Sequence, residues 1–184
     1  MASLSSDAAA PAVVVVVDPS GATPFSATQL MASLAAHTVL TLGQAASVVE
    51  DIVQNLPPSL THRQLDDLVM RRLASTMDCD YQDAAGQYDY EMLRRTLPET
   101  YVEVCERIRG NTVQAGGSAD VPAPRLSVKF IEFVRAHAAA LDQLLRDVLC
   151  DKERRVYSFF SMQTMRRTYL LKVHDETAEL PEHM

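Results

Sequence analysis

The side chains with the most reactive chemistry in this sequence are three cysteines and two isolated histidines. Cys79, Cys105 and Cys150 are scattered, and no two of them form a Cys-x-x-Cys pair. Zinc ribbons and dithiol redox centres need such pairs, so we expect no metal site and a reduced, cytoplasmic setting. His62 and His183 stand alone, and we expect structural or solvated roles for them.

Sequence motifs of common enzyme classes are absent. The chain contains no GxxxxGK[ST] loop, no GxGxxG, no HExxH, no GxSxG and no convincing pair of carboxylates. We therefore expect no catalytic residue in these 184 residues. Whether the chain takes part in an enzyme is left open by this observation.

Composition narrows the partners that the chain could bind. With 184 residues and 47% hydrophobic content, the chain can bury a sizeable core. A net charge of −7 argues against a nucleic-acid partner, which would favour a basic face. The apolar run near the N-terminus lacks a basic leader and is too short to span a bilayer, so we expect no membrane association.

Hydrophobic periodicity predicts a mostly α protein with a small N-terminal β element. Residues 1–12 are expected to be disordered, and Val13–Val17 is expected to form a buried strand before a turn at Asp18–Gly21. Helices are predicted over 25–37, 43–56, 59–77, 79–96 and 99–110. Ser26 and either Ser59 or Thr61 are the expected N-caps, and Gly86 is the expected weak point of the fourth helix.

A linker is predicted after these helices. Residues 111–124 are rich in Gly, Ser, Pro and Ala. They separate a compact domain over 13–110 from a helical segment over 125–184, in which we expect a break near His137.

The order of these elements resembles an ATP-cone, the allosteric module of ribonucleotide reductase large subunits. The strand, the glycine turn and the Phe that opens a helical bundle match its start. "LTHRQLDDLVMRRLA" (60–74), "DYQDAAGQY" (80–88) and "ETYVEVCERI" (99–108) are similar to later cone helices.

The C-terminal part is similar to the segment that precedes the catalytic barrel in the same family. It carries two motifs in the family's order, Thr164-x-x-Arg167-x-Tyr169-Leu170-Leu171-Lys172 and Pro181-x-His183-Met184. The resemblance extends over roughly residues 13–184. It implies that this chain holds the N-terminal regulatory part and not the barrel.

The resemblance also implies a nucleotide site, with ATP or dATP as allosteric effectors. Its positions in this chain are Gly21, Gln29, Thr61, His62, Asp66 and Arg95. Several family cations are missing, because Asp18 and Pro19 stand in the turn where Lys and Arg are usual. Gln29 replaces a Lys, and Pro98 replaces another basic residue. Each lost charge-assisted bond is worth about 1.5–3 kcal/mol, so we expect weak binding.

Two functions remain open at this point. The first is a regulatory part of a ribonucleoside-diphosphate reductase large subunit, acting in deoxyribonucleotide biosynthesis. The second is a non-catalytic binding or structural protein whose degenerate cone no longer binds nucleotide. In either case the apolar residues of 157–184 predict self-association or a protein partner, or else packing back onto helices within 126–149.

Overall fold

The computed structural model describes residues 14–18, 21–114, 120–149 and 157–184. Residues 1–12, which were predicted to be disordered, and Pro19, which was predicted to replace a nucleotide-site cation, lie outside the described residues. Contacts divide the chain into two compact units, Met1–Thr76 (unit 1) and Met77–Met184 (unit 2). The boundaries suggested by the sequence, 13–110 and 125–184, stay a prediction.

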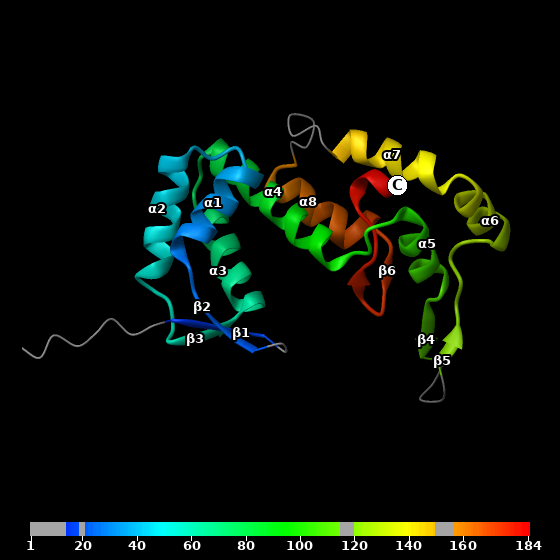
Figure 1. Cartoon of the computed structure of the whole chain (residues 1–184), viewed down its shortest axis with the longest axis horizontal. Helices are drawn as coiled ribbons and strands as arrows, with labels where there is room; N and C mark the ends of the chain where they lie inside the picture. The colour runs from blue at the N-terminus through cyan, green and yellow to red at the C-terminus, as the bar shows by residue number, and fades with distance from the viewer. Residues whose placement is uncertain (1–13, 19–20, 115–119, 150–156) are drawn as a thin grey trace, which may run out of the picture. The chain divides into compact units, whose positions relative to one another are not determined.

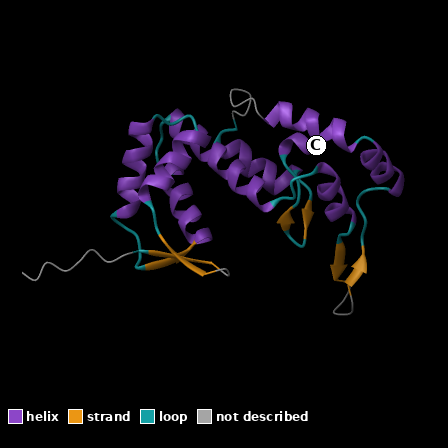
Figure 2. Ribbon diagram, viewed as in Figure 1, coloured by secondary structure: helices purple, strands orange, loops and turns teal. Residues whose placement is uncertain are grey.

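Unit 1 combines a small sheet with helices, which Figure 2 draws in orange and purple. Its elements are β1 Val15–Asp18, β2 Gly21–Pro24, α1 Ala27–His37, α2 Leu42–Val53, β3 Ser59–Thr61 and α3 His62–Ala74. The strand order is β2-β1-β3, with β1 antiparallel to β2 and parallel to β3. The predicted N-terminal β element is thereby confirmed.

The sequence prediction was wrong on two details of this sheet. Strand β1 is not buried on both faces, because Val16 is 3% exposed whereas Val17 is 41% exposed. Residues 59–61 were expected to begin a helix but form β3, whose Leu60 is buried. The helix starts only at His62, with Thr61 as its N-cap, one of the two caps that the sequence offered.

Unit 2 is built around the long helix α4. Its helices are α4 Cys79–Thr96, α5 Tyr101–Arg109, α6 Val128–Ala136, α7 Ala138–Leu149 and α8 Phe159–Thr164, with a π-helical turn η1 Met165–Tyr169 and a 3-10 turn η2 Pro181–His183. Two hairpins complete it, β4 Thr112–Gln114 with β5 Asp120–Pro122, and β6 Lys172–Val173 with β7 Glu176–Thr177. The predicted mostly α fold is confirmed, as is the helix break at His137.

The C-terminal segment packs along α4, as the brown and green helices of Figure 1 show. Tyr90 and Leu93 of α4 form a buried cluster with Met162, Leu170 and Leu180. The segment therefore contacts α4 more than helices within 126–149, which was the intramolecular alternative considered from the sequence. Phe160 and Tyr169 remain 79% and 61% exposed.

Helix α4 runs unbroken through Gly86, which makes a close contact with the segment just before α8. A Cβ atom at Gly86 would lie 1.7 Å from the carbonyl oxygen of Tyr157. Only glycine allows the backbone before α8 to approach α4 this closely.

Among the residues that the structure describes, no helix combines the length and the apolar character needed to cross a membrane.

Candidate functional site

The best candidate site suggested by the sequence lies at one end of the unit 1 sheet. Asp18 pairs with Gly21 across the β1–β2 hairpin, and Val17 pairs with Thr61 of β3. The glycine turn and the start of α3 therefore flank the same end of β1. Three of the predicted positions, Gly21, Thr61 and His62, are brought together by this register.

The backbone at Gly21 explains why a glycine occupies this position. Its φ is +145°, a conformation that side chains with a Cβ rarely adopt, and no atom would lie within 4 Å of a Cβ there. The requirement is therefore conformational, and the space beside the turn is open.

The first turn of α3 is capped by its own side chains. The Thr61 hydroxyl accepts a hydrogen bond from the backbone N–H of Gln64 at 3.2 Å. The side-chain oxygen of Gln64 accepts one from the backbone N–H of Thr61 at 2.8 Å. This capping box occupies part of the hydrogen-bonding capacity that a phosphate would use at a helix N-terminus.

His62 and Asp66 stand four residues apart and so share one face of α3. His62 is exposed, whereas Asp66 is partly buried. Both lie close to the end of β1 that carries the turn, because α3 begins directly after β3.

The other two predicted positions lie on different elements. Gln29 is exposed in the first turn of α1, where its backbone N–H donates a hydrogen bond to the Ser26 hydroxyl at 3.3 Å. Strand β2 separates it from the glycine turn, because α1 begins only after Pro24, which pairs with Val15 at the other end of β1. Arg95 is exposed in the last turn of α4, in unit 2.

Arg63 is a cation that the sequence reasoning did not consider. It is exposed in the first turn of α3, and no hydrogen bond or ion pair to it is seen among the described residues. Its signal in the sequence is its place directly after Thr61-His62, two of the candidate positions. The macrodipole of α3 and the Arg63 guanidinium both favour an anion at this end of the helix.

The chain has a mostly α fold. In unit 1, the glycine turn of the β1–β2 hairpin and the N-terminus of α3 flank the same end of β1. No family model matches the chain. Individual proteins do match it, and those reported below are large subunits or chains of ribonucleoside-diphosphate reductase.

The ribonucleoside-diphosphate reductase large chain of Schizosaccharomyces pombe is 26% identical over 139 residues, which are 74% of this chain and 16% of the relative. The large subunit of Danio rerio is 29% identical over 135 residues, 72% of this chain and 16% of the relative. The large subunit of Arabidopsis thaliana is 25% identical over 137 residues, 74% of this chain and 16% of the relative.

The similarity to ribonucleotide reductase large subunits expected from the sequence motifs is thereby confirmed. The chain spans about 16% of the length of these relatives. Nucleotide binding by the named positions stays a prediction.

Proposed function

We propose that this chain is a regulatory part of a ribonucleoside-diphosphate reductase large subunit, with an ATP-cone-like site in unit 1. The observation that carries the proposal is the meeting of Gly21, Thr61 and His62 at one end of the sheet. The similarity to reductase large subunits over about three quarters of the chain supports the same reading. The proposed effectors are ATP and dATP. The proposed process is deoxyribonucleotide biosynthesis, and the proposed location is the cytoplasm.

The site is expected to bind nucleotide weakly. Gln29 is neutral where the family has a Lys, and the α3 cap already satisfies two backbone or hydroxyl groups. Losing several charge-assisted bonds removes about 5–9 kcal/mol if the terms add. We expect a dissociation constant for ATP and dATP weaker than about 100 μM.

Calorimetric titration of the full chain with ATP and dATP tests the proposal. Because Arg63 is the exposed cation of the α3 start, Arg63→Gln should weaken binding by roughly tenfold. Arg71→Gln is the matched control, since Arg71 is exposed in the last turn of the same helix. Equal affinities of the two variants would contradict an effector site at the start of α3.

The second candidate is a non-catalytic binding or structural protein with a degenerate cone. The neutral Gln29 and the satisfied capping box favour this candidate. It predicts no saturable binding of either nucleotide at millimolar concentration. A nucleotide with a dissociation constant of about 100 μM, present at about 1 mM, would stabilise the folded state by about 1.4 kcal/mol. A thermal-shift assay therefore separates the two candidates.

Self-association or a protein partner through residues 157–184 is proposed for either candidate. Phe160, Tyr169 and Met184 are large exposed hydrophobic side chains of this segment, and the first two are its exposed aromatic ones. Light scattering on the full chain and on a Phe160→Ser, Tyr169→Ser variant tests this. Self-association through these side chains predicts a smaller assembly for the variant than for the full chain. Equal masses for both proteins would contradict self-association by these residues.

A further inference from the structure

Unit 2 contains a pocket whose lining residues all belong to that unit. It has a volume of about 260 Å³ and lies among the end of α4, the start of α5, α7 and η2. Its apolar lining includes Leu97, Leu145 and Leu180, of which Leu180 also belongs to the core. Leu145 and the neighbouring Arg146 follow Asp142 by three and four residues, so all three lie on one face of α7.

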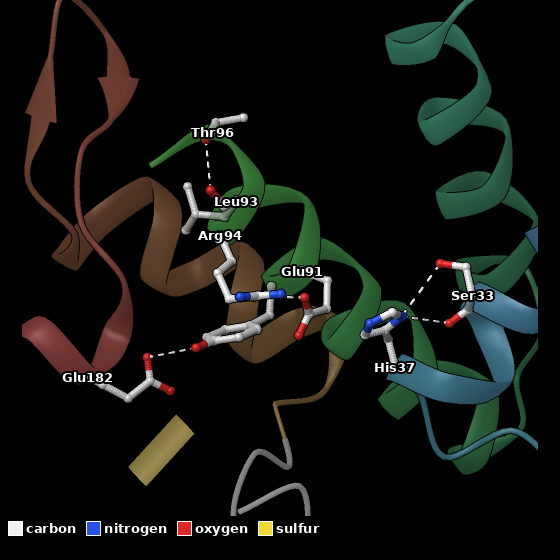
Figure 3. A network of polar contacts seen from close by, with 8 residues as sticks. Ser33, His37, Glu91, Leu93, Arg94, Thr96 and Glu182 are labelled. Atoms are coloured by element: carbon white, nitrogen blue, oxygen red, sulfur yellow. Dashed lines mark hydrogen bonds and ion pairs between the residues drawn. The ribbon is translucent and has the colours of Figure 1, made fainter. Parts of the chain in front are cut away.

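Two arginines, Arg94 and Arg146, are among the residues that line this pocket. Arg94 donates through Nε to Glu91 at 2.9 Å, an ion pair on α4 that Figure 3 shows. Its side chain is still 49% exposed. Arg146 donates through Nη2 to the neutral side chain of Gln143 at 3.2 Å. No acceptor for the remaining guanidinium N–H groups of Arg94 and Arg146 is seen within the described part of the chain.

The pocket lining also includes two carboxylates, Glu99 and Asp142, and the negative charge of each is reduced in a different way. Asp142 accepts a hydrogen bond from the Tyr101 amide at 3.0 Å, at the first residue of α5, where the helix macrodipole offsets the negative charge. Glu99 is exposed, so water and salt screen its charge. The guanidinium forks therefore remain the strongest recognition groups in the pocket.

His183 adds a polar group to the same lining. Its Nδ1 accepts the Leu180 amide hydrogen at 3.1 Å, so the proton of the neutral ring is on Nε2. Burial lowers the pKa of His183 to about 4, which keeps the ring neutral at neutral pH. A neutral ring adds a donor without adding a charge.

We propose that this pocket binds a small organic carboxylate, with the carboxylate between the Arg94 and Arg146 guanidinium groups and an apolar body against Leu97, Leu145 and Leu180. The planar guanidinium fork matches a carboxylate and can bind it bidentately. An apolar lining adds affinity for a hydrocarbon body that a bare inorganic anion does not have. The pocket lining includes none of the nucleotide positions Gly21, Gln29, Thr61, His62, Asp66 and Arg95.

Phenylacetate is the probe, titrated into the full chain and followed by two-dimensional NMR. A ligand of this size should bind with a dissociation constant of roughly 1–10 mM, with saturable shifts at pocket residues. Phenylacetamide replaces the carboxylate by a neutral amide and should bind about tenfold more weakly. Inorganic phosphate keeps the charge without the apolar body and should also bind more weakly.

Arg146→Gln is the decisive variant, since Arg146 is exposed and bonded only to a neutral partner among the described residues. It should weaken phenylacetate binding about tenfold, whereas Arg125→Gln, at an exposed position outside the pocket, should leave it unchanged. Absence of saturable shifts, shifts centred elsewhere, or equal binding of phenylacetamide would overturn the proposal. Equal binding of phosphate would overturn the role of the apolar lining.

Discussion

Asp89 of α4 and Arg166 of η1 form an ion pair in which the carboxylate is almost completely buried. Asp89 is 1% exposed, and it also accepts a hydrogen bond from the Gln163 amide group at 3.0 Å. Burial raises the pKa of Asp89, while Arg166 and Gln163 oppose this rise. The charge of Asp89 is therefore tolerated because two residues of the C-terminal segment satisfy it.

Arg166→Met should destabilise the protein by about 3–5 kcal/mol, because it leaves a buried carboxylate without its charged partner. Urea unfolding at neutral pH measures the change. Arg167→Met is the matched control, since Arg167 is exposed in the same turn, and it should change stability by less than about 0.5 kcal/mol. Equal losses in both variants would show that the ion pair has no special role.

Gly86→Ala should destabilise unit 2 by about 1–3 kcal/mol or more. The new methyl group would overlap the Tyr157 carbonyl, a backbone atom that can move only if α8 moves too. Gly43→Ala is the control, because a Cβ at Gly43 in α2 meets nothing within 4 Å. Thermal unfolding should show a lower transition for Gly86→Ala and an unchanged or slightly higher one for Gly43→Ala.

The contribution of His183 to the stability of unit 2 should fall as pH decreases from about 6.5 to about 4. The pKa of His183 is lowered from 6.5 to about 4 because burial disfavours the imidazolium. In this window the unfolded state binds more protons than the folded state, so stability decreases with falling pH, by at most about 3 kcal/mol from this residue.

His183→Asn isolates this effect from the titration of carboxylates. An Asn oxygen can still accept the Leu180 amide hydrogen but does not titrate. Urea unfolding of both proteins at about pH 7 and about pH 5 should show a smaller loss in the variant. Parallel losses would mean that His183 does not carry the pH dependence.

Cys79 should react with iodoacetamide much faster than Cys105. Cys79 is exposed, whereas Cys105 is 2% exposed and burial raises the pKa of its thiol. Thiolate fraction and access both set the rate of alkylation. Mass spectrometry of peptides from briefly labelled native protein measures the two rates; comparable labelling would contradict the buried position of Cys105.

The helices could be predicted from the sequence because their signals are local. Ser26 and Thr61 cap α1 and α3, and the break at His137 separates α6 from α7. Strand β3 could not be predicted, because three residues carry no clear period and their partner β1 lies far earlier in the chain. The hairpin β4–β5 was not predicted either, because its segment has a composition that indicated a linker.

The candidate site was predictable only in part for the same reason. Gly21, Thr61 and His62 could be named from family motifs, but their meeting depends on the non-local pairing of β1 with β3. Arg63 was not among the positions that the family motifs named, and Arg94 and Arg146 lie outside the quoted motifs. Burial of Asp89 could not be foreseen either, because an Asp on a helix is ordinarily solvated.

The packing of α4 against the C-terminal segment has a consequence for synthesis on the ribosome. Tyr90 and Leu93 are covered by Met162, Leu170 and Leu180, which are translated long after α4. Strands β1, β2 and β3 of unit 1 pair with one another, so their sheet needs no strand that is translated later. The nascent chain must therefore carry α4 with its apolar face uncovered until Leu180 has emerged, and this interval is when chaperones or aggregation can compete for it.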